Sequence, residues 1–517
     1  MKRNIIYYSF IILALSLLFS CKKSFLNSKY DGVVSPDTYP VSANNLEALV
    51  TGLYGMTNQM YYQAGDYSVC LGGDDATTLS GGNKGPFLEF DLFDADDNNS
   101  ANTETWIACY AVIKQSNEII NNTNSINDET VSATQLQDLK NRSLGQAYFL
   151  RALAYFDLVR TYGQVPLVTV IEVNYTAKKA AFTDIYDTIA SDLHNAEVLL
   201  PAVWANAGDL TSTETSTEYA RPSSGSAKSL LASVYLTMAG YPIKNTSYYA
   251  LAAAKAKEVL DSESVYGYQL LSEDQLWNPN NGWKTTANAE GVFTVFYNEN
   301  SSGNCMTSSQ QPSEMSGWND YFAEYTFYNE FPAGARKTAT FIDTVVTAGG
   351  TIFTPYTGFA SKHPHYRKLA LFPQTDMANM DAYIDWWSSR TIPVIRYAET
   401  LLVYAEAEAM ADGTPNSLAY TCLNRVRERA GENDMVPGLT GTVFLDSVIN
   451  ERKWEFAGLE PNARWFDLIR TETVAAANAK RSPNDIPLIG APNDASHTDY
   501  FAPIPLADKE LDPNLNN

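Results

Sequence analysis

The sequence predicts a mostly α fold, in which helical hairpins form a scaffold and long irregular loop insertions extend from it. Apolar residues recur at helical spacing in many segments, most strongly from 136 to 162. Between the helical segments, 60–105 and 262–392 are rich in Gly and Asn and show no sustained periodicity. Because functional residues are concentrated on long loops, we expect the two loop regions to form a second face that carries the site.

The segment 136–162 has apolar residues on two sides of the predicted helix. Phe149 and Phe156 belong to one stripe, and Tyr148 and Tyr155 belong to another. A helix that is buried on two sides is typical of stacked helical hairpins. Further helices are expected to begin near 44, to include Trp106 and Ile113, and to lie at 183–199, 225–239, 246–261, 393–411, 415–430 and 443–457.

The clearest hairpin signal lies around residue 413. Gly413 suits a left-handed cap at the end of one helix, Thr414 suits an N-cap, and Pro415 suits the first turn of the next helix. Hairpins of this kind resemble tetratricopeptide units, although no clean consensus repeat is present. Within the second loop region, the run 291–297 (GVFTVFY) predicts a single strand.

The composition and net charge limit the classes of function that fit the chain. The chain has 517 residues and a formal net charge of -23, and such a charge repels phosphate backbones, which argues against nucleic acid as a partner. It contains 32 Tyr and 9 Trp but only 4 His. Because tyrosine and tryptophan give rigid, amphipathic contact area, this composition favours a binding protein.

The N-terminus predicts a lipoprotein. Lys2 and Arg3 precede a mostly apolar stretch at 5–19 that is too short to span a membrane and that leads to Leu18-Phe19-Ser20-Cys21, a lipobox pattern. We therefore expect 1–20 to be a signal peptide, 21–43 a tether acylated at Cys21, and 44–517 a single domain. The remaining cysteines are far apart in the chain, so no metal or redox chemistry is expected of Cys70, Cys109, Cys305 and Cys422. Cys109 and Cys422 fall on apolar helical stripes and are expected to be buried thiols.

Several motifs together resemble the SusD/RagB family of nutrient-uptake lipoproteins. The helix at 145–166 (GQAYFLRALAYFDLVRTYGQVP) is similar to the family's central helix. The other matching motifs are 393–407 (PVIRYAETLLVYAEA), 423–431 (LNRVRERAG), 451–456 (ERKWEF), 464–470 (RWFDLIR) and 503–505 (PIP). Two departures are that 459–463 lengthens a turn and that Lys22-Lys23-Ser24 lacks the acidic residues that often accompany surface export.

The resemblance implies a SusD-like fold and a lipid-anchored protein at the outer membrane, exposed at the cell surface. It implies a SusC-like TonB-dependent transporter as partner and an oligosaccharide as cargo, or a peptide in the RagB branch. The charged residues of the motifs, Arg151, Asp157 and Arg396, are interpreted as paired charges that hold helices together.

Loop aromatics beside Asp or Asn are the candidate ligand contacts, because sugar rings stack on flat aromatic faces while polar groups bond the hydroxyls. Trp318 is the first choice. The full predicted set is Tyr67, Asp74, Asp75, Trp277, Trp283, Tyr297, Asn298, Trp318 and Asp320. Tyr321 and Trp386-Trp387 have the same character and could equally face the transporter. Shallow binding of this kind predicts micromolar or weaker affinity.

Two alternatives remain open at this point. The first is a peptide-binding uptake subunit. The second is an all-helical glycoside hydrolase, which needs two suitably spaced carboxylates, although no G-x-S-x-G, H-E-x-x-H, P-loop or dinucleotide motif is present. His363-x-His365 lacks a third metal ligand, so no catalytic residue, cofactor or metal is predicted, and Ca²⁺ in the acidic loops is left as an open possibility.

Overall fold

Helix α6 (Ala133–Tyr162) lies at the centre of the helical part of the protein. A capping box formed by Ser132 and Gln135 fixes its first turn, and Gly163, with a φ of +72°, ends it. Its residues are buried on both sides from Phe149 onward, which confirms the two stripes expected from the sequence.

The computed structural model describes residues 42–63, 69–171, 176–204, 221–279, 289–298, 303–372, 378, 380, 386–458, 460 and 464–516. Within it, Ser42–Asn517 forms one compact unit. Among these residues, no helix has both the length and the apolar character needed to cross a membrane.

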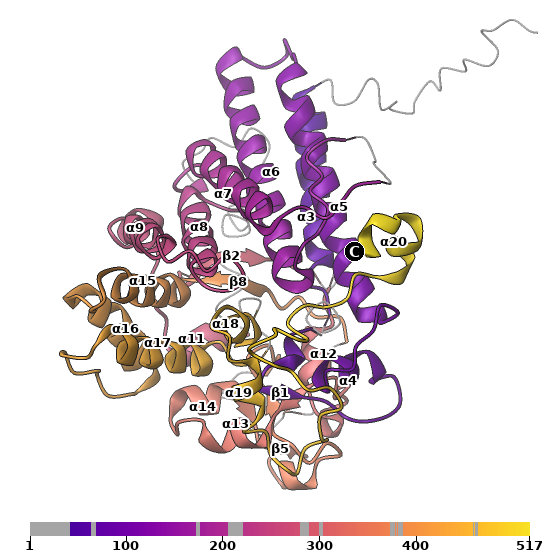
Figure 1. The fold of residues 1–517 in the computed structure, drawn as a ribbon, viewed down its shortest axis with the longest axis vertical. Coiled ribbons are helices and arrows are strands. Elements are labelled where there is room, and N and C mark those ends of the chain that lie inside the picture. The colour runs from indigo at the N-terminus through magenta and orange to yellow at the C-terminus, as the bar shows by residue number, and fades with distance from the viewer. Residues whose placement is uncertain are drawn as a thin grey trace, which may run out of the picture. The chain divides into compact units, whose positions relative to one another are not determined.

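The long helices pack one against the next in chain order (Figure 1). The series is α3 (Ala43–Gln59), α5 (Ser100–Asn122), α6, α7 (Phe182–Leu199), α8 (Ser224–Ala239), α9 (Tyr248–Leu260) and α15 (Tyr397–Asp412), followed by α16 (Ser417–Ala430) and α17 (Gly441–Glu455). The mostly α fold is therefore confirmed, and the stacked pairs agree with tetratricopeptide-like hairpins.

Buried charges join neighbouring helices, as the motifs predicted. Arg151 on α6 donates to Asp192 on α7 at 2.7 Å and to Asn117 on α5 at 2.7 Å. Asp157 accepts from the Tyr61 hydroxyl at 2.7 Å. These bonds satisfy charges that would be costly to bury alone.

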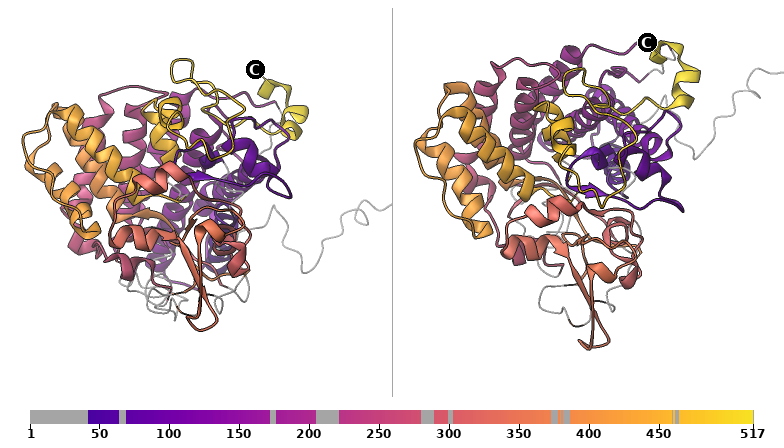
Figure 2. Two further views of the ribbon diagram at one scale, coloured as in Figure 1. Left: turned by 90° about the horizontal axis from the view of Figure 1, so that it is seen from below. Right: turned by 60° about the horizontal axis from the view of Figure 1, so that its bottom comes forward.

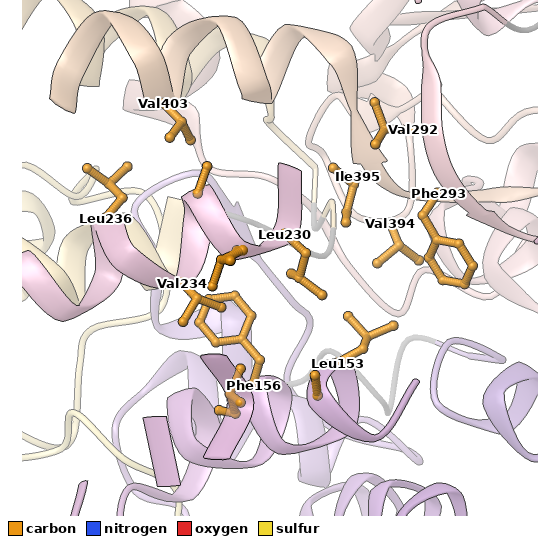
Figure 3. Packing of buried hydrophobic residues seen from close by; sticks show 14 of the residues in the cluster. Leu153, Phe156, Leu230, Val234, Leu236, Val292, Phe293, Val394, Ile395 and Val403 are labelled. Atoms are coloured by element: carbon orange, nitrogen blue, oxygen red, sulfur yellow. The ribbon is translucent and has the colours of Figure 1, made fainter. Parts of the chain in front are cut away.

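The main core lies where α6, α8, α15 and a small sheet meet (Figure 3). Leu153 and Phe156 on α6 face Leu230 and Val234 on α8, and Val292 and Val394 of the sheet close the same cluster. The sheet contains β2 (Gly291–Val295) and β8 (Ile392–Arg396), which pair antiparallel from Gly291↔Arg396 to Val295↔Ile392.

The prediction of a helix over 393–411 is wrong at its start. Residues Ile392–Arg396 form strand β8, and the helix begins at Tyr397. Ile392, Val394 and Ile395 are β-branched residues that pack well on a pleated surface, and the pairing with β2 supplies their backbone partners. The predicted strand at 291–297 is confirmed over Gly291–Val295.

The hairpin between α15 and α16 is confirmed, with a correction to its cap. Gly413 adopts the left-handed conformation, with a φ of +74°. The N-cap is Asn416 and not Thr414, because the Asn416 side chain accepts from the Ala419 N–H at 2.8 Å. Pro415 consequently precedes the helix and does not lie in its first turn.

The loop regions contain more regular structure than the sequence predicted. Their short helices are α4 (Gly85–Asp91), α10 (Glu263–Tyr266), α11 (Glu273–Trp277), α12 (Met306–Gln310), α13 (Tyr325–Glu330) and α14 (Ala335–Thr340). Their strands pair antiparallel as β1 (Ala76–Thr77) with β3 (Phe322–Ala323), β4 (Phe341–Ile342) with β7 (His365–Tyr366), and β5 (Thr344–Thr347) with β6 (Ile352–Pro355). The spacing of apolar residues in the sequence does not reveal elements this short. Each helix has fewer than two turns and each strand has at most four residues, so no repeating apolar pattern develops.

The C-terminal segment contacts both the helical scaffold and the loop regions. It contains α18 (Arg464–Arg470), α19 (Val474–Asn478) and α20 (Leu506–Leu511). Figure 1 shows α20 beside the N-terminal helices, where Leu506 N–H donates to the Asp97 carbonyl at 2.8 Å.

Figure 2 shows the salmon-coloured chain of 303–372 gathered on one side of the helices, where the β5–β6 hairpin projects from it.

Candidate functional site

The two loop regions, 60–105 and 262–392, come into contact, and together we call them the loop side. β1 from the first region pairs with β3 from the second, with Ala76 opposite Ala323. Nearby, Thr78 donates to the Asp320 carbonyl at 2.7 Å, and Lys84 forms a buried ion pair with the Asp320 carboxylate. The structure thus confirms that these loops come together, as the sequence predicted.

A buried ion cluster connects this loop side to the C-terminal helices. Arg396, which is 2% exposed, donates to Glu290 at 2.7 Å, to Glu455 at 2.6 Å and to Glu460 at 2.8 Å. Burial alone would raise the pKa of Glu455, but the guanidinium groups of Arg429 and Arg396 hold it well below its usual range. Glu455 is therefore ionised at neutral pH.

The other members of the cluster come from both parts of the chain. Arg336 on α14 pairs with Glu451 on α17 at 2.5 Å, and Lys368 pairs with Glu460 at 2.5 Å. Among the described residues, five cations meet five carboxylates: Arg336, Lys368, Arg396, Arg427 and Arg429 with Glu273, Glu290, Glu451, Glu455 and Glu460. Because the charges balance, the cluster can be buried without leaving an unpaired ion.

Several predicted ligand contacts are buried and bonded within the protein. Asp74 forms an ion pair with Arg464 at 2.7 Å. Asp75 is 1% exposed, and burial together with the charge of Asp74 raises its pKa to about 6. One Asp75 carboxylate oxygen accepts from the Gly458 N–H at 3.2 Å. In this structure the two aspartates join the first loop region to the C-terminal segment.

The buried aromatics of the predicted set also have internal partners. Trp277 is 7% exposed, with the Lys368 ammonium 5.1 Å from its ring centre. Tyr297 is 6% exposed, and its hydroxyl donates to the Asn58 carbonyl at 2.6 Å. Trp277 and Tyr297 therefore have little exposed ring surface, and like the paired Asp320 they make contacts within the protein.

Two predicted contacts reach the surface, and three predicted residues lie outside the described part of the chain. Trp318 is 37% exposed and Asn298 is exposed. Tyr67, Trp283 and the acylation site Cys21 are not among the described residues, so they stay predictions.

Trp318 is held by a tight turn. Its N–H donates to the Ser308 carbonyl at 2.7 Å, and Gly317 N–H donates to the Pro312 carbonyl at 3.0 Å. A side chain at Gly317 would overlap the Gln311 carbonyl, so the turn requires glycine there. The indole is therefore displayed on a backbone with little freedom to move.

Trp386 and Trp387 are the most exposed tryptophans of the described residues, at 63% and 42%. The Trp387 ring meets the Tyr62 ring edge-on, with centres 5.6 Å apart, and lies over Gly303, where a Cβ would overlap the indole. The backbones of Asn304 and Ser388 exchange two hydrogen bonds of 2.8 Å. Trp387 thus packs on Gly303 and is held in place by the backbone pair of Asn304 and Ser388.

We call Trp318, Trp386 and Trp387 the exposed tryptophans. All three are candidates from the sequence. Trp318 is preferred there because it lies in the region where the family resemblance would place ligand contacts, whereas Trp386 and Trp387 could equally face the transporter. The anchoring roles of Tyr62 and Asn304 left no sequence signal, since these contacts join residues far apart in the chain.

Histidine and cysteine chemistry does not mark a second site in the described residues. No group of three or more His, Cys, Asp or Glu side chains there could hold a metal ion. His365 is buried, its ring bonds Ser361 at 2.8 Å, and burial lowers its pKa to about 3. Cys109 and Cys422 are buried free thiols, as predicted, and Cys70 and Cys305 are buried free thiols as well.

Comparison with known proteins matches two family models. Residues 34–236 match a model described as "Starch-binding associating with outer membrane", and 354–517 match the SusD family model. The chain belongs to the SusD family. SusD-like protein P2 of Formosa agariphila is 28% identical, and the match covers 96% of this chain and 95% of that protein.

Solved structures show the same SusD-like fold. A SusD homolog from Bacteroides thetaiotaomicron superposes with a TM-score of 0.74 at 24% identity, covering 93% of this chain and 97% of that one. A SusD superfamily protein from Parabacteroides distasonis gives a TM-score of 0.72 at 26% identity, covering 91% and 98%.

The SusD-like loop side also contains a carboxyl group with a strongly shifted pKa. Glu324 accepts from the Phe327 N–H at 2.7 Å and from the Ser482 N–H at 2.6 Å. Burial and a hydrogen bond to Asp485 raise the pKa of Glu324 to about 7. Asp485 in turn lies 2.5 Å from the His363 ring.

This shift predicts a pH-dependent stability. Between the ordinary value of 4.5 and about 7, Glu324 holds a proton in the folded protein but not in the unfolded chain. Folding therefore takes up a proton, and the free energy of unfolding falls as the pH rises through this window. We expect Glu324→Gln to make the free energy of unfolding fall less steeply between pH 5 and 7, by a slope that corresponds to about one proton. Urea denaturation at several pH values in this range measures the slope. The exposed Glu428→Gln is the matched control, and an unchanged slope in Glu324→Gln contradicts the assignment.

Proposed function

We propose that this SusD-like protein binds an oligosaccharide at the exposed tryptophans and delivers it, chemically unchanged, to a partner TonB-dependent transporter of the SusC type. The observation that carries the proposal is the rigid display of Trp318 and Trp387 on loops whose other aromatics are mostly buried. Indole faces cover the C–H surfaces of sugar rings, and exposed polar side chains such as Asn298 can bond sugar hydroxyls.

The relatives support carbohydrate as the ligand. The model that matches 34–236 describes starch binding at the outer membrane. A solved SusD-like protein described as laminarin-binding has the same fold, with a TM-score of 0.70 at 22% identity over 91% of this chain. Laminarin is the ligand of that protein, and the glycan bound by this chain is to be found by screening.

A peptide cargo would use the same surface differently. A bound peptide needs backbone hydrogen-bond partners along an extended groove or edge, whereas flat rings on short loops suit sugar faces. A peptide array screened beside the glycan array separates the two kinds of ligand. Binding of peptides, and of no glycan, would replace this proposal with the peptide-uptake alternative.

Truncating the exposed tryptophans tests the site. We expect Trp318→Ala and Trp387→Ala each to raise the Kd for the glycan selected from an array by about tenfold, since a lost stacking contact of ~1.4 kcal/mol corresponds to that factor. The wild-type Kd should be micromolar or weaker, measured by titration calorimetry.

The matched control is Phe353→Ala, which removes an aromatic ring that is 66% exposed on the β5–β6 hairpin. It should leave the Kd unchanged. Equal affinities for the wild type and both tryptophan variants would remove these residues from the site.

Acylation of Cys21 is the second part of the proposal, because acyl chains at that position would hold the protein at the membrane. We expect Cys21→Ser to abolish incorporation of radiolabelled palmitate in cells that export the chain. Cys422→Ser, which changes a buried thiol, should keep the label. Persistent labelling of Cys21→Ser would refute acylation at this residue.

A further inference from the structure

A cavity of ≈ 300 Å³ lies between α3 and α6, and none of the exposed tryptophans lines it. Its walls come from α3, from α6 and from Trp204 and Arg221. Its volume is at the lower end of the range for small-molecule sites, so it fits a ligand of about one sugar unit. Its chemistry differs from that of the loop side.

Arg142 on α6 is a buried cation with weak partners. The residue is 6% exposed, and Asp138, its one ion-pair partner among the described residues, lies 3.5 Å away and is largely in solvent. Its Nε donates to the Asp138 carbonyl at a long 3.4 Å. By contrast, Arg151 on the same helix makes two bonds of 2.7 Å to Asp192, the length expected for a charge-assisted pair.

Arg221 supplies a second cation to the same cavity. Its guanidinium lies over the Trp204 ring, 5.1 Å from the ring centre. Trp204 is fixed in turn by a bond from its Nε1 to the Pro222 carbonyl at 2.9 Å. Among the described residues, no carboxylate forms an ion pair with Arg221.

Neutral polar groups complete the cavity wall. The Tyr54 hydroxyl donates to the Gln146 amide oxygen at 2.7 Å, and Ser143 lies one helical turn before Gln146. Glu47 is the one carboxylate among the lining residues. Two cations therefore face one carboxylate, in a chain whose formal net charge is -23.

We infer that this cavity binds a small carboxylate the size of a single uronate sugar, in a site separate from the exposed tryptophans. The planar forks of Arg142 and Arg221 match a carboxylate, which accepts paired N–H bonds. Tyr54 and Ser143 offer hydroxyls to the remaining polar groups of such a ligand. Glu47 disfavours a dianion such as phosphate, because a second negative charge would be repelled.

Titration calorimetry with galacturonate, galactose and inorganic phosphate tests the inference on the purified protein. We expect galacturonate to bind at least about tenfold more tightly than galactose, since the two differ in the carboxylate that the arginines recognise. Arg221→Gln should remove this difference. Ala48→Phe, on the exposed rim of the cavity, should weaken galacturonate binding by steric exclusion without changing any charge.

The matched control is Arg425→Gln, which removes an arginine paired with Glu263 at 3.0 Å outside the cavity and should leave the binding unchanged. Trp387→Ala should also leave it unchanged, which separates this site from the proposed glycan site. Equal affinities for galacturonate and galactose, tighter binding of phosphate, unaltered binding in both cavity variants, or loss of binding in Trp387→Ala would each overturn the inference.

Discussion

The buried Arg396 cluster is the interaction on which the loop side depends. Arg396 occupies the junction between strand β8 and helix α15, and its three carboxylate partners come from the start of β2, the end of α17 and the segment after it. Removing water from these ions is costly, and only the close pairing of opposite charges offsets that cost. The cluster therefore fixes a single arrangement of several segments at once.

This constraint explains how short elements can carry a defined surface. The loop side has a small apolar cluster of its own around Ile342, Val345 and Phe372, in contrast to the extensive core of the helical scaffold. Arg336 ties α14 to α17 by an ion pair with Glu451, and Lys368 ties the chain near β7 to the segment after α17 by an ion pair with Glu460. Because the supports are rigid, Trp318 and Trp387 can be held ready for a ligand, which lowers the entropy lost on binding.

Sequence reasoning succeeded where the signal is local and periodic, and failed where it depends on distant contacts. The stripes of α6 and the left-handed Gly413 were readable because each needs only neighbouring residues. The strand Ile392–Arg396 was read as helix because its partner lies about a hundred residues earlier in the chain. The contacts of Asp74 with Arg464 and of Trp277 with Lys368 also join distant parts of the chain, so neither contact could be predicted from the sequence.

The measurement that tests the role of the cluster most directly is backbone hydrogen exchange in Arg396→Met, with Arg425→Met as the control. Methionine keeps much of the side-chain volume but leaves Glu290, Glu455 and Glu460 without their common partner, at a cost of about 3–5 kcal/mol. If the cluster holds the loop side, exchange should accelerate in 289–297, 303–320 and 386–396, while protection in α5, α6 and α7 is unchanged. Unchanged protection in those loops, or an equal loss across the whole chain, would contradict this role.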